Sequence, residues 1–264
     1  MIKVQNLVKK YGDFTAVNDI SFEVQQGEIF AFLGPNGAGK TTTIKMLTTL
    51  LKPTSGQVEL DGLDPSKQHN EARKRFGIVF QDPSLDDELT AWENMDFHGV
   101  LYKVPRKIRH ERIEQLLKLF ELWDRRNDPV KQFSGGMKRR LEIARGLLHT
   151  PKIVFLDEPT LGLDPQTRNQ LWTHVQKLNQ EEQVTVFLTT HYMEEADRVA
   201  HRIAIIDHGK IVAQGTSQEL KEQTKSETLE QAFLALTGST IRDEDASSVD
   251  QMRNMARMFR RPRR

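Results

Sequence analysis

The stretch "GPNGAGKT", Gly34 to Thr41, decides the fold, because it follows the apolar run "IFAFL" and opens a segment with helical character. In this context the pattern G-x-x-x-x-G-K-[ST] is specific for a phosphate loop. Its glycines let the backbone pass close to phosphate oxygens, with the N–H groups pointing inward. The flanking strand and helix disfavour the alternative, a glycine turn with a chance lysine. The predicted phosphate contacts are Gly34, Pro35, Asn36, Gly37, Ala38, Gly39, Lys40 and Thr41.

Two side chains of this loop carry its chemistry. Lys40 is expected to neutralise the outer phosphates of a nucleotide, and the Thr41 hydroxyl is expected to ligate Mg²⁺. A second motif, the stretch "IVFLDEPT", supplies two carboxylates. Its four apolar residues predict a buried strand that ends in Asp157 and Glu158, at the sheet edge where ligands bind. We expect Asp157 to hold Mg²⁺ through water, and Glu158 to orient the attacking water or accept its proton.

Three single residues extend the predicted pocket. Gln81 follows the strand-like "GIVF" and is a candidate for contact with Mg²⁺ or the water, and His191 follows "TVFLTT" and is a candidate for a hydrogen bond to the terminal phosphate. Tyr11 precedes a glycine and is a candidate for stacking on a base. Each has an ordinary alternative, since a polar residue at a strand end is usually solvated and a tyrosine before a glycine usually packs. Their order and spacing favour the functional interpretation.

A second anion site is predicted in "QFSGGMKRR", Gln132 to Arg140. Ser134 is a typical helix cap, and Gly135 and Gly136 leave the first amide groups of the helix bare. Free N–H groups at the positive end of a helix dipole bind phosphate. The alternative is a plain serine-capped helix, so the residues alone do not explain why one chain carries two phosphate sites.

The organisation of the chain predicts an α/β fold. Buried strands such as "GIVF", "IVFL", "TVFLTT" and "RIAIID" alternate with helical segments, which implies a largely parallel sheet covered by helices. Between about residues 90 and 150 the strand signals stop, and three helical segments predict an inserted helical subdomain. A helix is also expected from Lys40 to about Leu51, before Pro53. After Gly238 the composition becomes polar and then basic.

Composition excludes several classes of protein. The 264 residues carry a formal net charge of +1, so no strong field favours nucleic acid, and no nucleic-acid partner is expected. Cysteine is absent, which excludes disulfides and thiolate metal sites. The N-terminus lacks the apolar core of a signal peptide, and the apolar runs are far shorter than the ~20 residues of a membrane span. We therefore expect a chain that does not cross a membrane by itself.

These motifs together resemble the nucleotide-binding subunits of ABC transporters over residues 1–238. The resemblance rests on Tyr11 in "KKYGDFTAVNDISFEV", the loop "GPNGAGKTT", Gln81 in "GIVFQDPSLDDELTAWEN", "FSGGMKRR", "IVFLDEPTLGLDP" and "TTHYMEEAD". It implies a P-loop ATPase with a RecA-like core, an antiparallel β-subdomain and the helical subdomain. It also adds Thr42 to the predicted ATP contacts.

The resemblance gives the second phosphate site a purpose. In this family two subunits enclose two ATP molecules, and the "SGG" helix of one caps the γ-phosphate bound by the other. Ser134, Gly135, Gly136 and Asp164 are therefore implied as contacts to ATP held by a second copy of the chain. The family pattern LSGGQ has Phe133 and Met137 at its ends here, which keeps the phosphate cap but removes the final glutamine side chain.

Finer features resemble the drug-exporter branch, similar to daunorubicin-resistance ATPases. They are "SLDDELTAWENM", "PTLGLDPQTR" and "TLEQAFLALTG". This implies a separate integral-membrane permease, a peripheral position on the cytoplasmic face of the cell membrane, and export of an amphiphilic compound. Export of lipid, polysaccharide or sodium stays open, as does an ABC ATPase that acts on ribosomes or DNA. Stacking on Tyr11 reads a ring face, so we expect GTP to be accepted less well than ATP.

The segment 239–264 is predicted to be a tail. Residues 251–264, "QMRNMARMFRRPRR", contain six arginines and no acid, and the methionines would share one side of a short helix. A basic amphipathic helix can lie on an anionic membrane surface or dock on a partner. A basic tail without a role and a nucleic-acid-binding tail are the alternatives.

Overall fold

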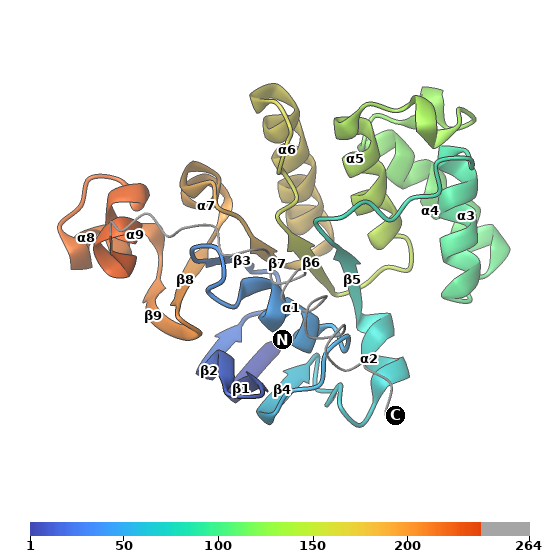
Figure 1. The fold of residues 1–264 in the computed structure, drawn as a ribbon. Helices are drawn as coiled ribbons and strands as arrows, with labels where there is room; N and C mark the ends of the chain where they lie inside the picture. Colours follow the sequence, from blue (N-terminus) through green and yellow to red (C-terminus); the bar gives the residue numbers. More distant parts are fainter. Residues whose placement is uncertain (239–264) are drawn as a thin grey trace, which may run out of the picture.

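The computed structural model describes residues 1–238 as two β-sheets with helices packed around them (Figure 1). Residues 239–264, with the predicted amphipathic helix at 251–264, lie outside the described residues. Among the helices of the described part, none combines the length and the apolar character that a membrane crossing requires.

The larger sheet has six strands in the order β5-β6-β7-β3-β8-β9. The first five are mutually parallel, and β9 runs antiparallel to β8. The bounds are β5 Phe76–Val79, β6 Ile153–Asp157, β7 Thr185–Thr189, β3 Ile29–Leu33, β8 Arg202–Asp207 and β9 Lys210–Gly215. The spatial order differs from the sequence order, so strands far apart in the chain end side by side.

The central strand β3 is buried on both faces. Ile29, Ala31 and Leu33 belong to one apolar cluster, whereas Phe30 and Phe32 belong to another. Because alternate side chains of a strand point to opposite faces, each cluster lines one face of the sheet. Burial on both faces explains why the strand-like runs in the sequence are apolar without alternation.

The smaller sheet covers the second face. It is antiparallel, with the order β2-β1-β4 and the bounds β1 Ile2–Tyr11, β2 Phe14–Val24 and β4 Ser55–Leu60. Phe22 of β2 stacks on Phe30 of β3, with ring centroids 5.6 Å apart, and also contacts Phe32 and Phe187. These aromatic contacts join the two sheets, so the antiparallel sheet is packed directly beneath the phosphate loop's strand.

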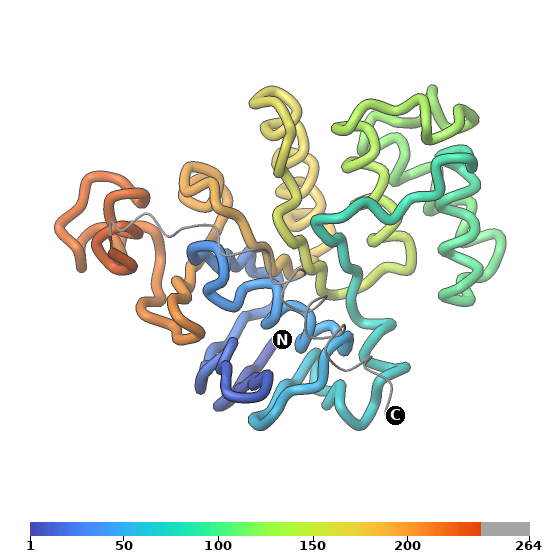
Figure 2. Tube along the Cα trace, in the orientation of Figure 1, coloured from blue at the N-terminus to red at the C-terminus, as the bar shows by residue number. Residues whose placement is uncertain are grey.

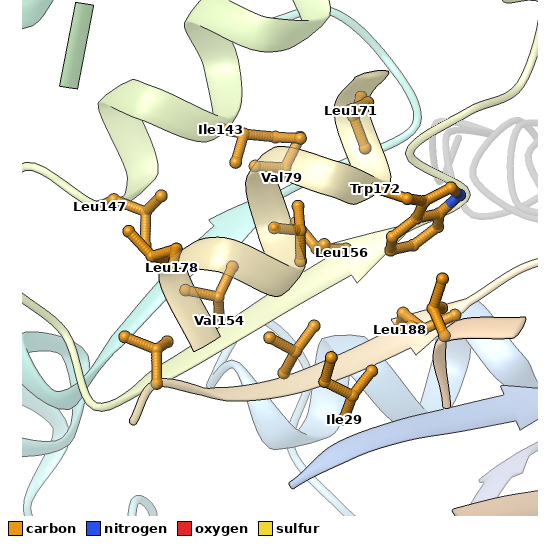
Figure 3. Packing of buried hydrophobic residues seen from close by; sticks show 14 of the residues in the cluster. Ile29, Val79, Ile143, Leu147, Val154, Leu156, Leu171, Trp172, Leu178 and Leu188 are labelled. Atoms are coloured by element: carbon orange, nitrogen blue, oxygen red, sulfur yellow. The ribbon is translucent and has the colours of Figure 1, made fainter. Parts of the chain in front are cut away.

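Helices cover both faces of the large sheet, and Figure 2 follows the chain through them. Their bounds are α1 Lys40–Leu47, α2 His69–Arg75, α3 Ala91–Leu101, α4 Arg106–Leu119, α5 Gly135–Gly146, α6 Pro165–Glu182, α7 Met193–Val199, α8 Ser217–Thr224 and α9 Leu229–Thr237, with short 3₁₀ turns at Trp123–Arg125 and Val130–Gln132. Figure 3 shows Ile143 and Leu147 of α5 close to Val154 and Leu156 of β6. The three helices expected between residues 90 and 150 are α3, α4 and α5, and the first apolar cluster joins them to the sheet.

Helix α1 is shorter than the sequence indicates. It ends at Leu47 and not near Leu51. The Thr48 hydroxyl donates to the Ile44 carbonyl, and Thr49 takes a left-handed conformation with φ 64°. The chain therefore leaves the helix well before Pro53, because the threonine pair supplies its own termination.

Two half-buried histidines lie between α3 and the end of α5. The rings of Tyr102 and His149 stack with centroids 3.8 Å apart, and His98 lies 4.8 Å from Tyr102. Burial lowers the pKa of His98 from 6.5 to about 3, with a further contribution from Arg145. Burial also lowers the pKa of His149 to about 4, although its hydrogen bond to the Phe76 carbonyl opposes the shift.

These lowered pKa values predict acid sensitivity. Between about pH 6.5 and pH 4 the unfolded chain binds protons at both histidines, whereas the folded chain does not. The free energy of unfolding therefore decreases as the pH is lowered from about 6.5 to 4. His149 alone would contribute about 3 kcal/mol across that window. Denaturant unfolding of the wild type at several pH values should show the slope, and His98→Gln/His149→Gln should flatten it. An unchanged slope in the double variant would contradict the assignment.

Candidate nucleotide-binding site

Four neighbouring strands, β5, β6, β7 and β3, end at the same edge of the large sheet, and each is followed by predicted site residues (Figure 1). Asp157 pairs in register with Thr189, and Thr189 pairs with Phe32. The phosphate loop, the acid pair and the loop of His191 are thus brought together by parallel pairing. The phosphate loop, the acid pair and His191 converge although Gly34 and His191 are 157 positions apart in the chain (191 − 34).

The phosphate loop fits its place only because two of its residues are glycines. A Cβ atom at Gly34 would lie 2.4 Å from the Ile206 carbonyl oxygen. One at Gly39 would lie 2.6 Å from the Ala16 carbonyl oxygen, and Gly39 has a φ of 110°. Both positions therefore exclude any larger residue, which holds the loop tightly against β8 and β2.

Lys40 lies across the loop that it belongs to. Its Nζ atom donates to the Gly34 carbonyl at 2.6 Å and to the Pro35 carbonyl at 3.1 Å. Burial lowers the pKa of the ammonium, and the nearby charges of Glu158 and Asp157 oppose this shift. The side chain is only 6% exposed, so its charge is directed into the loop and not into bulk water.

Asp157 is a buried carboxylic acid, only 2% exposed. The Thr189 hydroxyl donates to its Oδ1 atom at 2.6 Å. Burial raises the pKa of Asp157, and the hydrogen bonds from Thr189 and Thr41 and the charge of Lys40 oppose the rise. The acid therefore adjoins both the helix that starts at Lys40 and the neighbouring strand β7.

Glu158 leaves the sheet in a left-handed backbone conformation, with φ 47°. Its N–H group donates to the carbonyl and the hydroxyl oxygens of Thr189, both at 3.1 Å. Its Oε2 atom lies 3.5 Å from His191 Nδ1. The hydrogen bond from His191 lowers the pKa of Glu158, and the Lys40 charge adds to this effect. Glu158 is therefore ionised at neutral pH, as a proton acceptor must be.

Gln81 and Tyr11 border the same region. Gln81 is exposed and follows β5 by two residues, and Val79 at the end of β5 pairs with Leu156 of β6. Tyr11 ends β1; burial raises the pKa of its phenol, and a hydrogen bond to Thr42 opposes the shift. The Lys9 ammonium lies 5.1 Å from the centroid of the Tyr11 ring.

The predicted second phosphate site is the N-terminus of α5. The Ser134 side chain accepts a hydrogen bond from the Met137 N–H group at 3.3 Å, which confirms the expected cap. A Cβ atom at Gly136 would lie 2.5 Å from the Thr167 methyl group. Both carboxylate oxygens of Asp164 are bonded to Thr167, at 2.6 and 3.0 Å. Ser134, Gly136 and Asp164 therefore belong to one surface, formed where α5 and α6 begin.

The basic residues that follow the two glycines are already engaged within the chain. Lys138 donates to Asp87 at 2.7 Å, and Arg140 donates to the Phe120 carbonyl at 3.1 Å. Arg139 is buried and donates to backbone carbonyls and to a carboxylate. The N-terminus of α5 therefore offers backbone amide groups to an anion, and residues 138–140 supply no free cation there.

Two residues of the site were not predicted from the sequence, Thr189 and Arg139. The Thr189 hydroxyl donates a hydrogen bond to the Asp157 carboxylate and accepts one from the Glu158 N–H group. The sequence feature that could have indicated Thr189 is its place as a polar residue at the end of the apolar run "TVFLTT", two residues before His191. Arg139 gave no signal, because a run of basic residues on a helix usually forms a solvated face.

The fold and the site define a P-loop nucleoside triphosphatase. Strand β3 enters the phosphate loop, and the acid pair lies at the end of β6, which is separated from β3 by β7. The family model described as "ABC transporter" matches residues 17–161, more than half of the chain. The chain belongs to the ABC transporter family, as an ATP-binding and ATP-hydrolysing subunit.

The relatives agree with this assignment. The chain is 44% identical to the daunorubicin/doxorubicin resistance ATP-binding protein DrrA of Streptomyces peucetius, over 86% of this chain and 69% of the relative. It is 41% identical to the linearmycin resistance ATP-binding protein LnrL of Bacillus subtilis strain 168, over 87% and 73%. Among solved structures, the dimeric ATP-binding cassette MJ0796 bound to ADP and Pi matches with a TM-score of 0.72, 31% identity and coverage of 82% and 98%.

Proposed function

We propose that this ATPase drives export of a drug-like, amphiphilic compound through a separate integral-membrane permease, from the cytoplasmic face of the cell membrane. The observation that carries this proposal is the similarity, at 44% and 41% identity, to ATP-binding proteins named for resistance to daunorubicin/doxorubicin and to linearmycin. Hydrolysis of ATP at the nucleotide site would supply the energy for such transport.

The phosphate loop would hold the β- and γ-phosphates of ATP. Lys40 would exchange its contacts with the carbonyls of Gly34 and Pro35 for phosphate oxygens. The donor set also fits Mg²⁺, because the Thr41 hydroxyl is hydrogen-bonded to the Asp157 carboxylate and both are hard oxygen ligands. Thr41, Asp157 and Gln81 would hold the ion, which supplies charge neutralisation of the phosphates.

Glu158 is the proposed general base. Its lowered pKa keeps it ionised, and the neighbouring His191, whose Nδ1 atom lies 3.5 Å from this carboxylate, would also contact a terminal phosphate. Gln81 follows β5, which pairs with the strand that ends before Glu158, and would orient the attacking water. Tyr11, which is half-buried at the end of β1, is proposed to stack on the adenine ring.

Glu158→Gln should retain ATP binding and slow hydrolysis by roughly a hundredfold or more, because a positioned base contributes about that much. Steady-state phosphate release and nucleotide binding by fluorescence would measure the two effects. Lys40→Ala is the contrasting variant and should weaken ATP binding itself. Turnover of Glu158→Gln within about twofold of the wild type would remove Glu158 from the base role.

The second phosphate site is proposed to serve the ATP of a partner copy. Helix α1 buries Ile44 and Leu47 in the cluster on one face of the sheet, whereas α5 buries Ile143 and Leu147 in the cluster on the other face. The sheet therefore lies between the two helices of one chain. Residues 138–140 leave no free cation at the N-terminus of α5. This weak anion site therefore needs a phosphate that is already held by a phosphate loop with its own lysine. The dimer reported for MJ0796 supports this arrangement.

Ser134→Arg should abolish ATP-driven dimerisation, because a bulky cation would crowd the helix end, while ATP binding by the monomer stays within about twofold. Mixing Ser134→Arg with Lys40→Ala subunits should restore one pocket built from two wild-type halves. Sedimentation velocity with and without ATP would detect the heterodimer. Absence of any ATP-dependent heterodimer would contradict the cross-subunit role of Ser134, Gly135, Gly136 and Asp164.

The permease is proposed to dock on α3, within the helical subdomain proposed for residues 90–150. Phe97 and Leu101 expose 60% and 63% of their surface, and Val100 exposes 50%. Large apolar side chains grouped on one helix face mark a surface that another protein covers. The segment that carries Gln81 leads in the sequence to α3, so a permease contact on this helix would be connected to the hydrolysis site through that segment.

Export would be tested in cells that lack the gene and carry its permease. Wild-type protein should restore efflux of an amphiphilic antibiotic and co-purify with membranes, whereas Phe97→Asp/Leu101→Asp should lose both and retain ATPase activity in solution. Glu158→Gln is the control that should reach the membrane without efflux. Recovery of the wild type with ribosomes or DNA, and not with an integral-membrane protein, would refute transport.

A further inference from the structure

The buried side chain of Arg139 uses every N–H group that it has. A guanidinium carries five N–H donors, and five hydrogen bonds leave this one, at 2.5 to 3.1 Å. The acceptors are the carbonyl oxygens of Phe80, Asp157, Glu158 and Pro159 and the Oε2 atom of Glu142. Only 7% of Arg139 is exposed, so these bonds are shielded from water.

Three of these acceptors are consecutive carbonyls at the end of β6. Arg139 Nη2 donates to Asp157 and Glu158 at 3.1 Å each, and Nε donates to Pro159 at 2.7 Å. They span the position where Glu158 takes its left-handed conformation. A non-glycine residue keeps such a conformation only where its surroundings over-determine it. Arg139 binds this turn from the helix side, while Thr189 binds it from the sheet side.

The same helix face holds the loop of Gln81. Arg139 Nη1 donates to the carbonyl of Phe80, the residue before Gln81, at 2.5 Å. The Ser84 N–H group donates to Glu142 Oε1 at 2.7 Å, and Arg145 donates to the Ser84 carbonyl at 2.7 Å. Side chains three residues apart lie on one face of a helix. One face of α5 therefore fixes both ends of the segment that carries Gln81.

Helix α5 is also the element whose N-terminus is capped by Ser134. Arg139 lies little more than one turn from that cap, so the proposed contact to the partner's ATP and the turn of Glu158 belong to one hydrogen-bonded unit. Apolar contacts of Ile143 and Leu147 with the sheet anchor the other end of the helix (Figure 3).

We propose that Arg139 is a positioning residue for hydrolysis: it holds the Glu158 turn and the start of the Gln81 loop in register with α5. A phosphate bound at the start of α5 then aligns the base and the water-orienting residue of the same chain, which couples the two nucleotide sites of a dimer. The inference rests on the proposed function of Glu158 as the base.

Arg139→Lys is the decisive variant, because it keeps the charge beside Glu142 and loses the five-donor fork. It should lower kcat roughly tenfold or more with KM for ATP within about twofold, since a misplaced base slows the chemical step. Single-turnover hydrolysis in the Glu158→Gln background should then change by less than about twofold, because residues that act as a unit are non-additive. Arg139→Gln/Glu142→Gln replaces it if Arg139→Lys does not fold.

Arg112→Lys is the matched control. Arg112 is also largely covered, with 13% of its side chain exposed, and it is bonded to both carboxylate oxygens of Glu182 away from the site. The Arg112→Lys variant should leave kcat unchanged. Equal losses from Arg139→Lys in both backgrounds, or a kcat within twofold of the wild type, would overturn the inference. If Glu158→Gln alone leaves the rate unchanged, the proposed function fails instead.

Discussion

Burial of the Asp157 carboxylate at the end of β6 is the constraint on which the site depends. An acid that is 2% exposed requires hydrogen-bond partners and a nearby cation, since burial alone favours the neutral form. Thr189 supplies a hydrogen bond from β7, and Thr41 and Lys40 supply a second hydrogen bond and a charge from the start of α1. Satisfying one side chain therefore brings three separate elements together at the sheet edge.

Much of this arrangement could be predicted because it depends on local pattern. The phosphate loop, the acid pair and the apolar strands follow from spacing and composition, and the serine cap of α5 follows from its sequence. The strand order and the register do not, since apolar runs carry no information on which strands pair. Thr189 and Arg139 escaped prediction for the same reason: the groups they bind at the end of β6 are distant in the sequence, so a polar strand end and a basic helix run did not reveal these partners.

The two faces of the sheet separate the tasks of the protein. One face packs against α1 and the antiparallel sheet, so the phosphate loop rests on an aromatic layer built around Phe22 and Phe30. The other face packs against α5 and α6, which carry Ser134 and Asp164. Because the strands in between are buried on both sides, a shift of either layer is transmitted through a close-packed interior and not through solvent.

The strain at Glu158 shows why so many hydrogen bonds converge there. A left-handed backbone costs a non-glycine residue of the order of 1–3 kcal/mol, and glycine would remove that cost. Glycine has no carboxylate, so the chain keeps the strained residue and surrounds it with Thr189 on one side and Arg139 on the other. With its backbone fixed from two layers, Glu158 directs its carboxylate toward His191 and the neighbouring phosphate loop. The tight packing of the sheet thus maintains a conformation that the isolated turn would not adopt.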